Sequence, residues 1–213
     1  MKISLALSIT VIAAVTATTS GLADDGPPPP VVVGPGSPTI QHFTFINKEG
    51  KELPIDAERI LPFHEGVAAV KKGGKWGYID TNGKFIIEPQ FEDARSFNEG
   101  LAPVMKGTKI GIIEKSGEFL IKPTLTNAGD FNDGLCPVEI DGKWGYLAKS
   151  GHIEISPQYD EAANFSDDLA AVRKDGKFGF INRKGKFVVK NEYDWVSGFY
   201  DGYASVSKLS EQP

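Results

Sequence analysis

The sequence predicts an all-β protein built from repeats, and three observations support this prediction. A motif of lysine, an apolar residue and glycine recurs every 34 residues, beginning at Lys75, Lys109, Lys143 and Lys177. Glycine accounts for 24 of the 213 residues, more than a helical protein would tolerate. Turn-forming dipeptides such as Asp141-Gly142 separate short apolar segments. A fixed period with these features indicates a repeat array.

Each repeat is predicted to form an antiparallel meander of three short strands, which we call strands A, B and C. In the second complete copy, strand A covers residues 101–104, strand B 109–114 and strand C 118–122. Two residues such as Asp175-Gly176 join strands A and B and suit a type I′ turn. A glycine ends the turn between strands B and C in every copy: Gly50, Gly83, Gly117, Gly151 and Gly185. A longer connector then leads to the next strand A.

Apolar residues on both faces of the strands predict that each sheet is covered on both sides. In strand B, Trp76 and Tyr78 lie on the face opposite Ile79. In strand C, Ile86 points away from its two neighbours, which are also apolar. Stacked neighbouring repeats would supply this cover. One phenylalanine per copy is expected to be the plug between successive repeats: Phe63, Phe97, Phe131, Phe165 and Phe199.

The two ends of the array predict how it closes. It begins with strands B and C alone, over residues 43–55, and ends with a lone strand A over residues 203–207. If that last strand A pairs beside the first strand B, the two ends together complete a fifth meander. We therefore favour a closed five-bladed, propeller-like ring, which hides its edges, over an open stack like a β-solenoid.

The N-terminus reads as an export signal over residues 1–23. Lys2 supplies a short positive region, an apolar run covers residues 3–15, and small residues precede a cleavage site after Ala23. The apolar run is shorter than the roughly 20 residues that a membrane span needs. The protein is therefore predicted to be exported, either periplasmic or secreted, without membrane insertion after cleavage.

The remaining chain divides into three predicted parts. Residues 24–40 are rich in proline and glycine and are expected to form an extended linker. The repeat domain is expected over residues 41–208, with a C-terminal tail over residues 209–213.

Charge and cysteine content exclude several function classes. The formal net charge of −5 argues against a nucleic-acid binder. One cysteine and three histidines exclude a disulfide framework and disfavour a metal cluster, and we expect no cofactor. Cys136 occupies a position held by alanine in the other copies, so it is expected to pack in the core. His42, His64 and His152 fall at three different repeat positions, which gives no sign of a shared role.

An acidic residue precedes strand A in every copy: Glu65, Glu99, Asp133, Asp167 and Asp201. In a closed ring these carboxylates would lie on one circle, where they would attract a cation or a basic partner. Alternatively, each carboxylate accepts a backbone N–H bond in its turn or pairs with the lysines of strand B. We favour the structural role, because only a structural role is needed in every copy.

Two aromatic residues break the repeat pattern and form the candidate interaction surface, Trp195 and Tyr200. They replace polar residues of the other copies: Asp93, Asn127 and Glu161 for Trp195, and Asn98, Asn132 and Ser166 for Tyr200. Exposed aromatic side chains are common in binding sites. The alternative is that they cap the last repeat. No catalytic, cofactor-binding or metal-binding residue is predicted.

At these residues the chain resembles the bacterial WG-repeat family, over residues 43–208. The resemblance rests on the K-[W/I/F]-G motif, the F-x-[D/E]-G-L-A-x-V block around strand A, and the prolines Pro89, Pro123 and Pro157. The sequence departs from the family pattern at Ile110 and Phe178, where tryptophan is expected, and at Asn191, where proline is expected. The first copy has Phe43-Thr44 in place of the Trp-Gly pair.

The resemblance implies a repeat scaffold and says nothing of an activity. We expect an exported, non-catalytic, monomeric scaffold that binds another protein of the cell envelope or a secreted protein. One alternative is a module that binds a glycan or a small ligand. A less favoured alternative is an enzyme that uses carboxylates such as Asp133 and Asp167.

Overall fold

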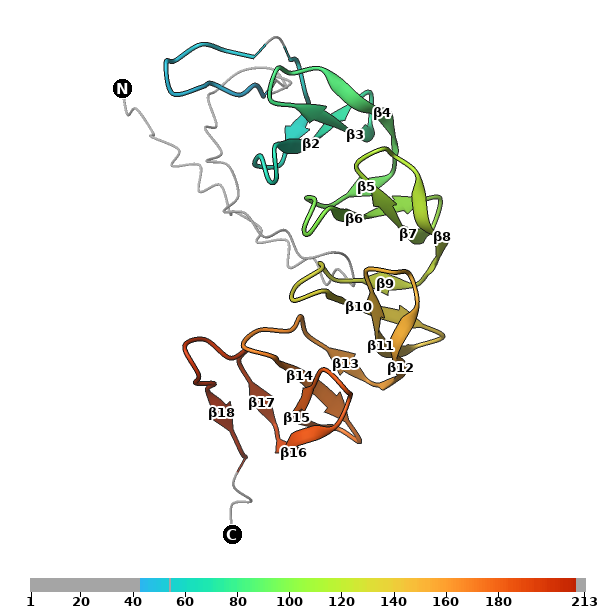
Figure 1. Cartoon of the computed structure of the whole chain (residues 1–213), viewed down its shortest axis with the longest axis vertical. Coiled ribbons are helices and arrows are strands. Elements are labelled where there is room, and N and C mark those ends of the chain that lie inside the picture. The colour runs from blue at the N-terminus through green and yellow to red at the C-terminus, as the bar shows by residue number, and fades with distance from the viewer. Residues whose placement is uncertain (1–42, 54, 210–213) are drawn as a thin grey trace, which may run out of the picture.

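The computed structural model describes residues 43–53 and 55–209. In that part of the chain all regular secondary structure is β-strand, as predicted. The predicted signal peptide and linker, and His42, lie outside the described residues. The strands form four four-stranded sheets and a final two-stranded one, which follow one another along an open arc (Figure 1).

All four complete sheets have the same antiparallel topology, and their strands are adjacent in chain order. The first contains β1 (Arg59–Ile60), β2 (Val67–Lys72), β3 (Lys75–Asp80) and β4 (Phe85–Phe91). The second contains β5 (Asp93–Ala94), β6 (Leu101–Lys106), β7 (Lys109–Glu114) and β8 (Phe119–Leu125). The third contains β9 (Asn127–Ala128), β10 (Leu135–Ile140), β11 (Lys143–Ala148) and β12 (Ile153–Tyr159). The fourth contains β13 (Glu161–Ala162), β14 (Leu169–Lys174), β15 (Lys177–Asn182) and β16 (Phe187–Tyr193), and the last hairpin contains β17 (Trp195–Val196) and β18 (Val206–Ser207).

Each sheet has one strand more than the three predicted. The additional strand has two residues and lies in the predicted connector, where for example β5 pairs with β6. A second tight turn produces this pairing, because Glu99 and Gly100 both have positive φ, 52° and 85°. The chain therefore folds back on itself before strand A, and the predicted meander is the larger part of a four-stranded sheet.

The predicted turns are present. Asp141 and Gly142 have φ of 51° and 77°, as a type I′ turn between strands A and B requires. Gly117, at the end of the turn between strands B and C, has φ of 86°. Glycine is favoured at such positions because it has no Cβ to oppose positive φ.

The glycine of each repeat motif lets two strands approach closely. A Cβ built on Gly145 would lie 2.4 Å from the carbonyl oxygen of Ile155 and 2.7 Å from the nitrogen of Pro157. Both atoms belong to the backbone of β12, and the β11–β12 register shifts between Trp144 and Tyr146. The motif therefore needs glycine because strand C crosses directly over strand B at this point.

Replacing Gly145 with alanine is expected to lower the free energy of unfolding by about 1–3 kcal/mol, because the new methyl group meets backbone that has little freedom to move. Urea unfolding followed by circular dichroism measures the change. Gly198→Ala is the matched control, since its Cβ would meet the Tyr200 ring at an ordinary 3.5 Å. Equal stability losses in the two variants would contradict this account of the motif.

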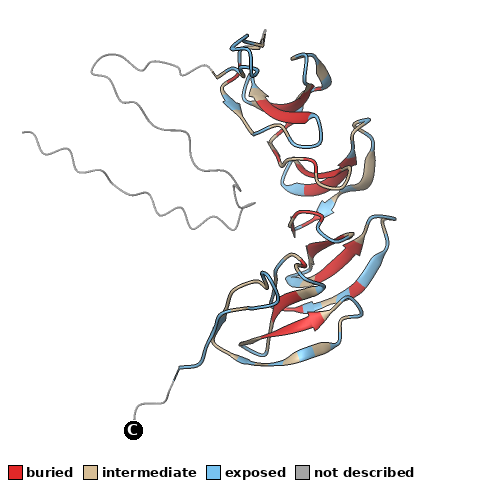
Figure 2. Cartoon of the chain, turned by 60° about the vertical axis from the view of Figure 1, so that its left-hand side comes forward, coloured by how far each residue is buried: buried red, intermediate tan, exposed pale blue. Residues whose placement is uncertain are grey.

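The core lies between successive sheets, and buried residues line the strands there (Figure 2). One core cluster contains Phe91 of the first sheet together with Val104 of the second. The predicted phenylalanine plugs pack against strand B of the preceding sheet. The ring of Phe97 lies 4.8 Å from that of Tyr78, and the ring of Phe165 lies 4.8 Å from that of Tyr146.

The prediction that both faces are covered holds for strand B but was wrong for strand C. Tyr78 and Ile79 point to opposite faces and are both fully buried. In strand C, by contrast, Ile86 is 40% exposed and Val188 is 58% exposed. No neighbouring sheet covers strand C on the side of these two residues, so that face is open to solvent.

The closing strand pair that we predicted is not formed among the described residues. β18 pairs with β17 alone, and the first copy forms its own partial hairpin through the Phe43–Ala57 and Ile46–Glu52 bridges. These two ends lie at opposite ends of the arc (Figure 1). The array in this structure is therefore open, with one half-sheet at each end.

Candidate functional site

The two candidate residues lie on the last hairpin of the array. β17 pairs with β18 in a register that places Trp195 opposite Ser207. Tyr200 pairs with Tyr203 across a tight turn that begins at Asp201. Both candidate side chains are exposed, Trp195 to 55% and Tyr200 to 73%.

The hairpin holds Trp195 and Tyr200 apart and does not join them into one platform. Trp195 lies at the open end of the hairpin, whereas Tyr200 lies beside the turn that closes it. At about 3.3 Å per residue, the two are separated by roughly 15 Å along the hairpin. The candidate surface is therefore elongated, and a ligand that contacts both residues must be larger than a single sugar ring.

The positions of Trp195 and Tyr200 are polar and unburied in the other repeats. We call the residues at one position of successive repeats a column. The column of Trp195 contains Arg59, Asp93, Asn127 and Glu161, and the column of Tyr200 contains His64, Asn98, Asn132 and Ser166. None of these eight residues is buried. The repeat fold therefore needs no aromatic residue at either position.

Three further exposed apolar residues on this end of the array escaped the sequence analysis. Tyr203 is 82% exposed, Val206 45% and Leu209 81%. Unlike Trp195, Tyr203 and Val206 belong to columns that are apolar in every sheet. An alignment of the repeats could have revealed them. In the complete sheets strand B lies beside strand A, whereas no strand B follows this last strand A within the described residues.

The acidic column has a structural role between neighbouring repeats. A carboxylate oxygen of Glu65 accepts the backbone N–H of Gly100 at 3.0 Å. Glu99 accepts the N–H of Gly134, also at 3.0 Å, and Asp167 makes the equivalent bond 35 residues along the chain at 2.9 Å. These carboxylates thus accept N–H groups from the turn of the next repeat, and not from their own turn as predicted.

The lysines that pair with this column also differ from those expected. Lys115, in a turn between strands B and C, lies 3.1 Å from the carboxylate of Glu65, and Lys149 lies 3.6 Å from that of Glu99. Burial raises the pKa of Glu65, but hydrogen bonds from Lys115 and from Gly100 outweigh it and hold the pKa below its usual value. Among the described residues, no group of three or more potential ligands has a geometry that could hold a metal ion.

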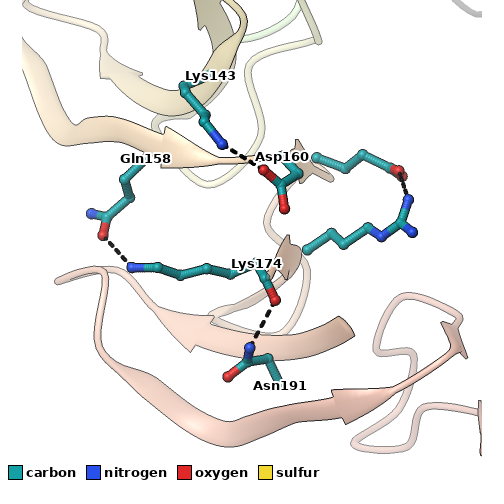
Figure 3. Close-up of polar contacts among 7 residues, drawn as sticks. Lys143, Gln158, Asp160, Lys174 and Asn191 are labelled. Atoms are coloured by element: carbon teal, nitrogen blue, oxygen red, sulfur yellow. Dashed lines mark hydrogen bonds and ion pairs between the residues drawn. The ribbon is translucent and has the colours of Figure 1, made fainter. Parts of the chain in front are cut away.

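The strand-B lysines bind a different set of acceptors, 17 residues further along the chain. Lys143 lies 2.6 Å from Asp160, and Lys75 lies 2.6 Å from Glu92 (Figure 3 shows the first pair). In the same region Lys174 donates to the side-chain oxygen of Gln158 at 3.1 Å (Figure 3). These are exposed polar links between neighbouring sheets.

Cys136 and the described histidines show no constellation for catalysis. Cys136 is fully buried, as expected from its column, and burial raises the pKa of its thiol. His64 contacts the carbonyl oxygen of Phe97 at 2.7 Å, which joins two repeats. His152 lies in the turn before β12, in another repeat, and pairs with Glu154 at 2.7 Å.

A protein-family model described as "WG containing repeat" matches the chain five times, over residues 58–76, 76–109, 110–144, 144–178 and 178–209. Together these matches span well over half of the chain. The chain belongs to the WG-repeat family. The resemblance noted in the sequence is thereby confirmed.

No curated protein matches this WG-repeat chain. Among solved structures, the extracellular domain of the putative one component system BT4673 from B. thetaiotaomicron is 14% identical, with a TM-score of 0.44, and the match covers 81% of this chain and 31% of that one. KlHsv2 with loop 6CD replaced by a Gly-Ser linker is 14% identical, with a TM-score of 0.44 and coverage of 70% and 59%. At such low TM-scores, neither similarity bears on this chain's function.

The departures from the WG-repeat pattern are accommodated by packing. Ile110 replaces the tryptophan of the motif and is buried to the same degree as Trp76. Asn191 replaces proline, and its side chain donates to the carbonyl oxygen of Lys174 at 2.8 Å (Figure 3). An apolar residue thus suffices at the tryptophan position. Over its described residues, the WG-repeat array contains no helix with the length and hydropathy of a membrane span.

Proposed function

We propose that this chain is an exported, non-catalytic WG-repeat scaffold that binds another protein of the cell envelope through Trp195 and Tyr200. The observation that carries the proposal is that both aromatic side chains are exposed at positions that are polar in every other repeat. Tryptophan and tyrosine are enriched among the residues that supply most of the binding energy in protein interfaces. Solvent-exposed aromatic residues without a structural need therefore favour recognition.

The spacing of the two residues supports a macromolecular partner. Trp195 and Tyr200 stand at the two ends of one hairpin. A protein surface spans such a distance, whereas a monosaccharide does not. The rigid sheets behind the hairpin would hold both residues in place, which limits the entropy lost on binding.

Export is the second part of the proposal and rests on the sequence. Residues 1–23 combine Lys2, an apolar run and small residues before the expected cleavage site. A partner in the same compartment follows from this location.

The test is affinity capture with the tagged chain from an envelope extract of the cells that produce it, followed by a binding titration with the purified captured protein. Trp195→Ala is expected to weaken that affinity by about 30-fold, the equivalent of roughly 2 kcal/mol. Tyr200→Ala is expected to weaken it in the same direction.

Tyr203→Ala is the matched control, because Tyr203 is as exposed as Tyr200 but belongs to an apolar column. It should leave the affinity for the captured protein unchanged. Equal binding by the wild type and by Trp195→Ala would overturn the proposal. Release of the bound material by soluble sugars would assign the surface to a glycan instead.

A further inference from the structure

The array begins and ends with complementary halves of one sheet. At the C-terminal end, β17 and β18 correspond to the short strand and strand A, and no strands B and C follow within the described residues. At the N-terminal end, residues 43–53 and 55–57 correspond to strands B and C, which the Phe43–Ala57 and Ile46–Glu52 bridges hold together. Joined edge to edge, the two halves make one complete four-stranded sheet.

The C-terminal half exposes side chains that every complete sheet buries. Val206 is 45% exposed, whereas the other members of its column are fully buried: Val70, Val104, Val138 and Val172. Tyr203 is 82% exposed, whereas the residues of its column in the first three sheets are at most 7% exposed: Val67, Leu101 and Leu135. This edge therefore lacks the strand that covers it elsewhere.

The N-terminal half shows the complementary deficit. Ile46 is 68% exposed, whereas its column in the four complete sheets is buried to 1% exposure or less: Ile79, Ile113, Leu147 and Ile181. Two contacts fix this alignment. Phe45 packs on Phe63 as Tyr78 packs on Phe97, and Asn47 accepts the N–H groups two and four residues later, as Asp80 does.

We propose that a second copy of this chain completes the sheet, so that β18 of one copy pairs with residues 43–47 of the next. The register follows from the complete sheets, in which Val70 lies opposite Gly77 and Ala68 opposite Ile79. By this register Val206 faces Thr44, and Ala204 faces Ile46. Addition of a strand to an exposed edge is a common mode of protein association.

Polar groups at the two ends match in the same way. Three members of the acidic column, Glu65, Glu99 and Asp167, accept the N–H of the glycine 35 residues along the chain. Asp133 has Asp168 in place of that glycine. Among the described residues, Asp201 accepts no such bond, and the N–H of Gly66 in the first repeat donates none to the column. In the proposed junction, the repeat spacing places Asp201 of one copy against Gly66 of the next.

Charge also matches across the junction. Lysines in the turns between strands B and C reach acidic residues 50 positions earlier, as Lys115 reaches Glu65 and Lys149 reaches Glu99. Lys48 occupies this turn position in the first copy and is exposed. The same spacing brings it to Asp167 of the neighbouring copy. A salt bridge there would repeat a contact that the array already uses.

The shape of the array favours a second copy over closure within one chain. The two half-sheets lie at opposite ends of the arc (Figure 1). To meet within one chain they would have to bend the junctions between sheets, and the buried Arg95–Asp130 contact resists bending at the junction of the second and third sheets. A second copy joins head to tail without such bending, and a head-to-tail contact leads to a ring of copies or an open chain of copies. The protein is then an oligomer, not the monomer expected from sequence.

Disulfide trapping tests this inference directly. Thr44→Cys and Val206→Cys are combined in the full chain, because directly opposed residues in adjacent strands have Cα atoms within disulfide range. Mild oxidation is expected to give reducible species of two or more chains on a non-reducing gel. The single-cysteine variants are the controls and should remain uncross-linked, since the natural Cys136 is fully buried. A cross-linked species of one chain would mean closure into a ring, and no cross-link would mean that the ends do not pair; either result overturns the proposal.

Sedimentation velocity gives an independent measurement. The wild type is expected to sediment as an assembly that dissociates on dilution. Val206→Lys should raise the dissociation constant by at least roughly tenfold, because it would bury a charge in the junction. Ile153→Lys is the matched control, since Ile153 is 38% exposed on β12 of the third sheet, away from both ends. A monomeric wild type, or equal effects of the two variants, would contradict the inference. Neither variant changes Trp195 or Tyr200, so failure here leaves the proposed function standing.

Discussion

Replacing Asp130 with alanine is expected to lower the free energy of unfolding by about 3–5 kcal/mol. Asp130 lies 2.8 Å from Arg95, and the two side chains are only 10% and 12% exposed. The pair joins the loop after β5 to the loop after β9, and so joins two successive sheets. Alanine would leave the guanidinium of Arg95 buried without its counter-charge, which accounts for the size of the effect.

Urea unfolding at neutral pH measures the loss, and the exposed Glu161–Arg173 pair supplies the control. Its two side chains are 53% and 41% exposed at a similar distance of 2.7 Å. Glu161→Ala should cost no more than about 1 kcal/mol, because solvent screens an exposed pair. If Asp130→Ala and Glu161→Ala lower the free energy of unfolding equally, burial does not increase the contribution of the Asp130–Arg95 pair.

The strands and most turns could be predicted from sequence because each repeat encodes them locally. Gly117 and Asp141-Gly142 are examples, since positive φ at these residues is a property of the residue types themselves. The same chemistry is present at Asp133-Gly134, which the sequence pattern assigns to a connector. Reading that dipeptide as a hairpin turn would have revealed the fourth strand of each sheet.

The curvature of the array could not be predicted in this way. The sequence shows that the two ends are complementary, and this alone favours a closed ring. How far one sheet turns relative to the next depends on contacts such as Arg95–Asp130, which occurs at one junction and in no repeating motif. Local patterns specify the unit, whereas packing between units specifies the shape.

The exposure of the two candidate residues could be predicted from sequence, but their arrangement on the hairpin could not. Trp195 and Tyr200 are exposed, as aromatic residues outside the repeat pattern should be. The turn at Asp201 and Gly202 makes the segment from Trp195 to Tyr200 one arm of a hairpin. It belongs to the same class as the turn at Asp133-Gly134, so both details depend on the same kind of turn.

Replacing Phe165 with alanine is expected to cost about 3–5 kcal/mol of unfolding free energy. Phe165 is fully buried, and its ring packs edge-on against Tyr146 of the preceding sheet. Its backbone carbonyl also accepts a hydrogen bond from Asn132 at 2.8 Å. Removing the ring leaves a cavity between the third and fourth sheets, where the surrounding strands are held by their own ladders and cannot collapse into it.

Phe199→Ala tests whether this plug acts by filling space between sheets. Phe199 makes the same ring contact, with Phe180 at 4.7 Å, but it is only half-buried because no complete sheet follows it. The same substitution should therefore cost clearly less at Phe199 than at Phe165 in parallel urea titrations. If both variants lose the same unfolding free energy at low protein concentration, the ring contact alone accounts for the loss, and burial between sheets does not. If the loss at Phe199 grows towards that at Phe165 as the protein concentration rises, a second copy is covering the end of the array, because only association makes the burial of this position depend on concentration.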